Sequence, residues 1–336
     1  MILSKEQRQV VESPEEKIVV MSAAASGKTR ILIERIRWVL KNGYDPSKMV
    51  CITFTNNAAT EIKLRLGDDY KDGMFIGTVH GYANSLLTKA GVQTRSFIRA
   101  EEFDELFNLI IDHPQVVEEV DFLALDEAQD SSSAQFDFIF NMIKPKAFLV
   151  VGDIRQSIYG FNDANPKLIL SLSKDDDVTT YSMTQNHRNS IEVIKYSNWI
   201  LNKMKKIPVE EVLGQRNDSG VVETIRLSQI ANMLKEPYGD WAILCRYNKT
   251  ISRILGVLAS EGIPAITFRQ AQQGLEDLQR KIDSNAVKVL TIHSSKGLEF
   301  NNVIVAEQAW RSEENLRLMY VAATRAKNEL YWVKGK

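Results

Sequence analysis

Short apolar runs rich in β-branched residues alternate with longer amphipathic stretches along the chain. Seven runs predict strands buried on both faces, at residues 17–23, 49–55, 122–128, 147–153, 241–246, 287–293 and 302–307. Helical spacing of apolar positions predicts helices at residues 29–42, 57–66, 133–143, 190–205, 248–260 and 313–327. This alternation is typical of parallel sheets covered by helices. Because crossovers are right-handed, two doubly wound α/β lobes are the expected fold.

The length of 336 residues suits two domains of about 150–170 residues each. A strand-like segment, VTTYSM, is followed by the polar QNHRNS and a new helical pattern. We therefore predict a first domain at residues 1–184 and a second at residues 185–336. Within the first domain, residues of about 82–118 have room for a short helical insertion.

Charge and cysteine content narrow the function classes. The net charge is −1, from 42 basic and 43 acidic residues, so any grip on nucleic acid must come from a local groove and base stacking. Cys51 and Cys245 each lie in an apolar run, which predicts buried thiols and no disulfide or zinc site. No apolar run approaches the roughly 20 residues of a membrane span, and the amino terminus does not resemble a signal peptide. The expected location is the cytoplasm, with no membrane partner.

The segment SAAASGKT (22–29) follows a predicted strand and opens a helix, as a phosphate-binding loop does. Lys28 would reach the β- and γ-phosphates of ATP, and the Thr29 hydroxyl would bind Mg²⁺. Backbone N–H groups of the loop would cradle the phosphates, from Ser22, Ala23, Ala24, Ala25, Ser26 and Gly27. Only Gly27 remains of the usual glycines, and alanine adopts positive φ only with strain. The alternative is an ordinary strand–helix turn.

Polar residues also follow two other predicted strands. Asp126 and Glu127 end the run LALDE, where the carboxyl edge of a parallel sheet would expose them. Asp126 would hold Mg²⁺ and Glu127 would deprotonate the attacking water; a solvated loop is the alternative. Gln156, after the run 147–153, is placed to sense the γ-phosphate. Tyr159 and Phe161 would stack on unpaired bases or fill a core.

The order of these motifs resembles the UvrD/Rep/PcrA family of superfamily 1 helicases, from residue 3 to about residue 332. LSKEQRQVV (3–11) is similar to its glutamine motif, and TFTNNAATEIKLRL and IGTVHGYANSLL are similar to its first two DNA-contact motifs. QNHRNS, VLTIHSSKGLEF and LRLMYVAATRAKNELY resemble later motifs in the expected order. The resemblance implies two RecA-like lobes with ATP between them, and 3′→5′ movement on DNA.

The resemblance also implies further site residues. Gln7 would read the adenine, Arg30 would pack near the base, and His187 stands where the family has a stacking tyrosine. Glu299 would contact the ribose, and Arg188 and Arg325 would face the γ-phosphate. The DNA track would be lined by Phe54, Asn56, Thr78, His80, Tyr159, Phe161, Thr291 and His293. For His80 and His293, a structural role is the alternative.

The long accessory insertions of larger relatives are not expected in either lobe. The favoured function is therefore an ATP-dependent translocase or helicase on single-stranded DNA, with strand separation or loading supplied by a protein partner as a hypothesis. An RNA-directed remodelling ATPase and a nucleotide-binding switch that does not hydrolyse ATP are the alternatives. ATP and Mg²⁺ are the expected cofactors.

Overall fold

The protein is described from a computed structural model, which covers residues 3–160, 163–205, 210–269, 274–307 and 312–334. The chain divides into two compact units. The first contains residues 1–22 and 27–183, and the second contains residues 23–26 and 184–336. The predicted boundary after residue 184 differs from this division, because Thr184 and Ala23–Ser26 both group with the second unit.

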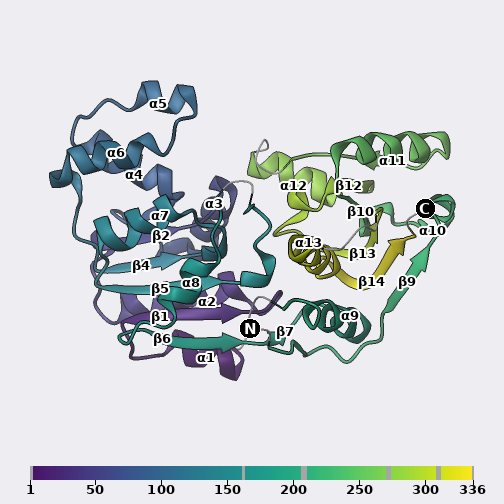
Figure 1. The fold of residues 1–336 in the computed structure, drawn as a ribbon, viewed down its shortest axis with the longest axis horizontal. Helices are drawn as coiled ribbons and strands as arrows, with labels where there is room; N and C mark the ends of the chain where they lie inside the picture. The colour runs from purple at the N-terminus through teal and green to yellow at the C-terminus, as the bar shows by residue number, and fades with distance from the viewer. Residues whose placement is uncertain (1–2, 161–162, 206–209, 270–273, 308–311, 335–336) are drawn as a thin grey trace. The chain divides into compact units, whose positions relative to one another are not determined.

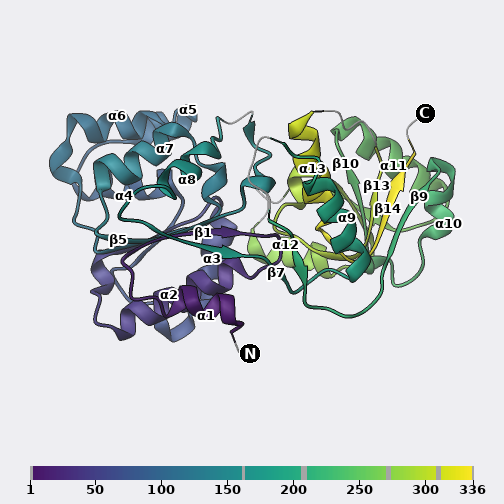
Figure 2. The ribbon, with the colours of Figure 1, turned by 60° about the horizontal axis from the view of Figure 1, so that its bottom comes forward.

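The first unit is built on a fully parallel sheet with the strand order β3-β2-β4-β5-β1-β6. Its strands are β1 (Lys17–Ser22), β2 (Met49–Ile52), β3 (Phe75–Gly77), β4 (Phe122–Leu125), β5 (Ala147–Gly152) and β6 (Thr179–Met183). Its helices are α1 (Lys5–Val11), α2 (Lys28–Lys41), α3 (Asn56–Leu66), α4 (Val79–Lys89), α5 (Arg95–Ala100), α6 (Glu105–Asp112), α7 (Ser133–Asp137) and α8 (Lys167–Leu172). Figures 1 and 2 show α1–α3 on one face of the sheet and α4, α7 and α8 on the other.

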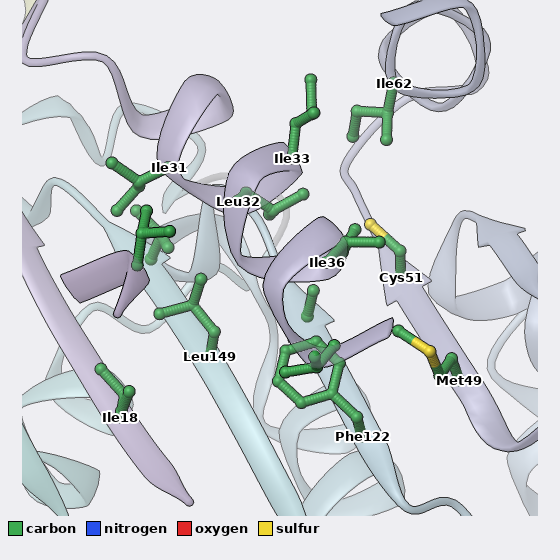
Figure 3. Close-up of a cluster of buried hydrophobic side chains, with 14 of the residues drawn as sticks. Ile18, Ile31, Leu32, Ile33, Ile36, Met49, Cys51, Ile62, Phe122 and Leu149 are labelled. Carbon is green, nitrogen blue, oxygen red and sulfur yellow. The ribbon is translucent and has the colours of Figure 1, made fainter. Parts of the chain in front are cut away.

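The core of the first unit explains why its central strands read as continuous apolar runs. Every residue of β4 and β5 is buried, as strands covered on both faces require. Figure 3 shows Ile31, Leu32 and Ile36 of α2 among side chains of the neighbouring strands, including Phe122 and Leu149. Burying a large aliphatic side chain contributes about 1.5–3 kcal/mol, so this helix is fixed to the sheet whose strand β1 leads into the segment SAAASGKT (22–29).

The second unit repeats the architecture with the parallel strand order β11-β12-β10-β13-β14-β9. Its strands are β9 (Val221–Ile225), β10 (Trp241–Cys245), β11 (Ala265–Ile266), β12 (Val287–Thr291), β13 (Phe300–Val305) and β14 (Ala326–Val333), with a separate pair β7 (Gln185–Asn186) and β8 (Leu213–Gly214). Its helices are α9 (Ile191–Leu201), α10 (Ile230–Met233), α11 (Asn248–Ser260), α12 (Leu275–Asp283) and α13 (Glu313–Ala323). Two parallel α/β units confirm the predicted fold class.

Several element boundaries differ from the sequence prediction. The helix predicted at 313–327 ends at Ala323, and the strand β14 follows. The hydroxyl of the next residue, Thr324, donates a hydrogen bond to the Tyr320 carbonyl. The helix predicted at 133–143 is α-helical only to Asp137 and continues as a π-helix over Phe138–Ile143.

Both cysteines are buried and free, as the apolar runs predicted. Burial raises the pKa of the Cys51 thiol, and burial with the nearby Glu307 carboxylate raises the pKa of Cys245 to about 12. The helices in the described ranges are all too short or too polar to cross a bilayer.

Candidate functional site

The phosphate-loop segment connects β1 to the first turn of α2, which begins with Lys28, Thr29 and Arg30. Gly27 precedes the helix and has φ +90°, a backbone conformation that residues with a side chain rarely adopt. A Cβ at Gly27 would also lie only 2.6 Å from Nε2 of Gln7. Glycine is therefore required here both by backbone conformation and by the close approach of Gln7.

Gln7, which was predicted to read an adenine, is buried in α1 and takes part in a capping box. Its side-chain Oε1 accepts a hydrogen bond from the backbone N–H of Ser4 at 3.1 Å, and its backbone N–H donates to Ser4 Oγ at 3.3 Å. This arrangement satisfies the first turn of α1. It also holds Nε2 of the Gln7 side chain beside Gly27.

Ala25 adopts φ +57°, in the left-handed region. For an L-residue with a Cβ this conformation costs about 1–2 kcal/mol. Alanines in this segment were expected to adopt positive φ only with strain, and one of them, Ala25, has this conformation. Strain of this kind is concentrated at functional sites.

The acidic pair follows β4 at the carboxyl edge of the first sheet. Asp126 is buried, and its Oδ1 accepts from the Glu127 amide at 2.9 Å. Glu127 has φ +52°, and its Oε2 accepts a hydrogen bond from Nε2 of Gln129. A carboxylate held in a strained backbone conformation and fixed by an amide is oriented before any ligand binds.

Gln156, the predicted γ-phosphate sensor, lies in a short helical turn (Ile154–Gln156) after β5. Its Nε2 donates to Asp153 Oδ2 at 2.7 Å. The Asp153 amide in turn donates to Oε1 of Gln129 at 2.9 Å, the same side chain that donates to Glu127. Gln129 and Asp153 therefore join the predicted sensor to the predicted base.

Sequence reasoning did not single out Gln129, Asp153 or Arg155. All three are buried polar residues within the DEAQD and GDIRQ segments. Polar residues that directly follow buried strands were a usable signal, because buried polar groups need partners. The sequence did not say which partner each would have.

The predicted metal ligands supply chemistry suited to Mg²⁺. Thr29 offers a hydroxyl and Asp126 a carboxylate, and Mg²⁺ prefers hard oxygen ligands, usually one or two from the protein with phosphates and waters completing the shell. Among the described residues, no group of three or more His, Cys, Asp or Glu side chains could hold a metal ion alone. This donor set therefore fits a metal ion that binds together with a nucleotide.

Two predicted DNA-contacting aromatic residues of the first unit meet in the structure. Phe54 and Tyr159 stack with ring centroids 4.9 Å apart and planes at 27°. Phe54 remains 38% exposed, so part of its ring surface is open to solvent. Asn56 is exposed at the start of α3, and Phe161 lies outside the described residues.

Thr78 and His80 are half-buried near the start of α4. The Thr78 hydroxyl caps this helix by accepting from the Gly81 amide at 3.1 Å. The His80 ring contacts two rings of the helical segment that follows, with centroids 5.2 Å from Phe107 and 5.5 Å from Phe103. Its Nε2 is 3.0 Å from Asp104 Oδ1. In this structure both side chains therefore have structural partners, the alternative that the sequence analysis left open for His80.

A cavity of about 550 Å³ lies at this edge of the first unit. Its lining includes Phe54, Thr78 and His80 together with Asp126 and Glu127. Predicted DNA-contacting residues and the predicted acidic pair thus share one cavity.

In the second unit, Arg188 and Glu299 form an ion pair, with Nε and Oε2 2.5 Å apart. Lys327 Nζ lies 2.8 Å from the other carboxylate oxygen. Burial raises the pKa of Glu299, but the positive charges of Arg188, Lys327 and Arg325 outweigh this effect, and the net pKa is lowered. Burial lowers the pKa of Arg188 although Glu299 opposes the shift. Lys327 was not among the predicted site residues.

The remaining predicted residues of the second unit include Arg325, whose charge also lowers the pKa of Glu299. Arg325 is buried, and its Nε and Nη1 donate to the carbonyls of Val321 and Leu298, each at 3.1 Å. Thr291 ends β12, with its hydroxyl 2.9 Å from Ser294 Oγ. His293 is half-buried in the turn that follows, and His187 is exposed.

Comparison with known proteins gives the family context of this geometry. The sequence model described as the UvrD/REP helicase N-terminal domain matches residues 3–116 and 112–177, and the UvrD-like helicase C-terminal domain matches residues 270–335. A putative ATP-dependent DNA helicase of Acanthamoeba polyphaga mimivirus is 25% identical, over 96% of this chain and 51% of its own. The ATP-dependent DNA helicases PcrA of Leuconostoc citreum and Staphylococcus aureus are 23% and 26% identical, over 78% and 75% of this chain and 49% of their own. The chain thus spans about half the length of these relatives.

Proposed function

Because the chain belongs to the UvrD/REP helicase family, we propose that it hydrolyses ATP to move along single-stranded DNA. The relatives are named ATP-dependent DNA helicases, and this activity is carried over to the present chain as a proposal. Movement from 3′ to 5′ is part of the same proposal.

The observation that carries the proposal is the chain of hydrogen bonds at the carboxyl edge of the first sheet. It runs from Glu127 through Gln129 and Asp153 to Gln156. Groups that are fixed in advance stabilise developing charge without reorganising during the reaction. A base and a phosphate sensor held in one network are what nucleotide hydrolysis requires.

In the proposed reaction, Lys28 neutralises phosphate charge and Glu127 accepts a proton from the attacking water. Gln156 donates to the γ-phosphate, and Arg188 and Arg325 stabilise the charge that builds up during transfer. Mg²⁺, held by Thr29 and Asp126, would supply charge neutralisation between the phosphates. The remaining nucleotide contacts are proposed for Gln7, Arg30, His187 and Glu299 and for the backbone of residues 22–27.

The DNA contacts are proposed on both units. In the first, the exposed Phe54 ring stacked on Tyr159 offers a surface for an unpaired base. Asn56, Thr78 and His80 would contact the strand beside it, and Thr291 and His293 would do so in the second unit. Changes between nucleotide states would alter the grip of the two units in turn and so produce stepping. Separation of a duplex by a protein partner is a further part of the proposal.

The proposal is tested by steady-state ATP hydrolysis of the purified chain alone, with single-stranded DNA and with single-stranded RNA. We expect strong stimulation by DNA, weak stimulation by RNA, and loss of activity in Lys28→Ala and Glu127→Gln. Loss of one catalytic group of this kind lowers kcat by on the order of 10²-fold or more.

Two results point to other functions. Stronger stimulation of hydrolysis by RNA than by DNA assigns the chain to RNA remodelling, since the 2′-hydroxyl group is what distinguishes RNA from DNA. Nucleotide binding without hydrolysis under every condition assigns it to a nucleotide-binding switch. The strained Ala25 in the phosphate loop is the observation that favours this second candidate.

A further inference from the structure

Arg155 is a buried cation at the carboxyl edge of the first sheet, and none of the proposed roles includes it. Only 6% of its surface is exposed. Its Nε and its backbone amide both donate to Asp153 Oδ1, at 2.7 Å and 3.1 Å. Its Nη2 donates to the Ser22 carbonyl at 2.8 Å. A buried charge is stable only when it is paired and hydrogen-bonded, and these contacts meet that requirement.

Asp153 is shared between Arg155 and the proposed phosphate sensor. One carboxylate oxygen serves Arg155, while the other accepts from Nε2 of Gln156 at 2.7 Å. The Asp153 side chain is fully buried, so water cannot replace either partner. Rotation of the carboxylate would break bonds on both sides. The orientation of the Gln156 amide therefore depends on the contact between Asp153 and Arg155.

The third contact of Arg155 reaches the start of the phosphate loop. Ser22 is the last residue of β1, and its own hydroxyl donates to the Gly152 carbonyl of β5 at 2.9 Å. The Arg155 guanidinium thus joins the end of β1 to the Asp153 carboxylate, which follows the neighbouring strand β5. Guanidinium geometry suits such a bridge because its donors are held in one plane with fixed directions.

We propose that Arg155 is a positioning residue that links the phosphate loop to Gln156 through Asp153 and so sets the preference of the site for ATP over ADP. The proposal rests on the proposed function, because it assigns Gln156 to the γ-phosphate. The β-phosphate contacts of the loop do not depend on Gln156. Losing the link therefore weakens ATP binding and turnover while leaving ADP binding nearly unchanged.

The test uses the full chain with Arg155→Lys, which keeps the charge but not the planar set of donors. The dissociation constants of ADP and of a non-hydrolysable ATP analogue are measured, together with kcat, KM and Tm. We expect the preference for the analogue over ADP to fall about tenfold, as the loss of one charge-assisted hydrogen bond predicts. The dissociation constant of ADP should change less than about twofold, well below the tenfold step of one lost bond. Arg253→Lys, on the exposed face of α11, is the matched control.

A double-mutant cycle separates positioning from a merely structural role. If Arg155 acts through Gln156, then Arg155→Lys adds nothing to the loss of ATP preference in Gln156→Ala. A lowered Tm with an unchanged preference, or additive losses in the double variant, overturns the proposal. If Arg155→Lys does not fold, Asp153→Asn with Arg155→Gln removes both charges, and the same loss of preference is expected.

A parent chain that binds both nucleotides but does not hydrolyse ATP would contradict the proposed function and not the proposed role of Arg155. The binding preference would then still report on Arg155.

Discussion

The polar groups at the carboxyl edge of the first sheet and the charged cluster of the second unit are held in different ways. In the first unit, Gln129, Asp153 and Arg155 are all buried and are joined to one another by hydrogen bonds. In the second unit, the side chains of Arg188 and Glu299 are 21% and 39% exposed. Buried groups keep their geometry because no water competes for them. A partly exposed ion pair depends less on its partner, because water can solvate either charge when the other is lost.

This difference predicts that the buried network of the first unit is sensitive to substitution, whereas the charged cluster of the second unit tolerates substitution and responds to ligands. The buried network can fix the proposed base and sensor before ATP binds, but removing one member leaves another without a partner. The cluster of Arg188, Glu299 and Lys327 can release its arginine to a phosphate at little cost. Its substitution should affect chemistry more than folding.

The largest expected effect is that of Asp153→Ala on stability. Arg155 would become a buried charge without its carboxylate, a change that costs about 3–5 kcal/mol. Glu299→Ala removes a partly exposed carboxylate, and water can solvate the cations that remain, so it should cost less than Asp153→Ala. Chemical denaturation of both variants measures the difference. Equal losses would show that the two regions are not held differently.

The next effect concerns Phe54, the exposed member of the aromatic pair in the first unit. Phe54→Ala should weaken binding of single-stranded DNA about tenfold, since one stacked base contributes ~1–3 kcal/mol, while stability changes little. Fluorescence anisotropy with a labelled oligonucleotide measures the affinity. Leu64→Ala, also exposed on α3, is the control and should leave binding unchanged. Similar affinities for the two variants would remove Phe54 from the proposed DNA track.

Much of the fold could be predicted because strands buried on both faces read as unbroken apolar runs, as β4 and β5 do. The strands that were not predicted include β3 and β9, which lie at the ends of their sheets and are partly exposed. Edge strands of this kind carry no continuous apolar pattern. Helical spacing across YVAATRAK also concealed the end of α13, which depends on a local turn at Thr324.

Less of the candidate site could be predicted, because its residues act through partners distant in sequence. Lys28, Asp126 and Gln156 were proposed from short motifs that follow predicted strands, without knowledge of their partners. The carboxylate that fixes Gln156 and the arginine that fixes this carboxylate became visible only in the folded network. Their roles in nucleotide chemistry are still predictions, as are those of the other site residues.

A smaller effect is expected from relieving the strain at Ala25. Ala25→Gly removes about 1–2 kcal/mol of left-handed strain but adds about 0.5–1 kcal/mol of chain entropy to the unfolded state. The net result should be a gain of about 0.5 kcal/mol in the free energy of unfolding. Ala23→Gly, at a position without positive φ, should instead destabilise the chain. If both variants lose stability equally, Ala25 is not strained.

The smallest effect should come from an exposed cluster far from the network. Glu119 lies between Lys146 and Lys48, and its ion-paired hydrogen bonds with these two lysines lower its pKa from 4.5 to about 2. A carboxylate with a lowered pKa contributes stability above pH 4.5 that disappears as the pH falls toward 2. The difference in Tm between the parent and Glu119→Gln should therefore be constant near neutral pH and shrink in acid. A difference that grows in acid would contradict this assignment.

Displacement of streptavidin from biotinylated oligonucleotides tests directly whether ATP hydrolysis moves this chain along single-stranded DNA. We expect ATP-dependent displacement that is faster from the 5′ end than from the 3′ end, and none with Glu127→Gln. Displacement that is independent of ATP, or absent from both ends while DNA-stimulated hydrolysis proceeds, would contradict the proposed function.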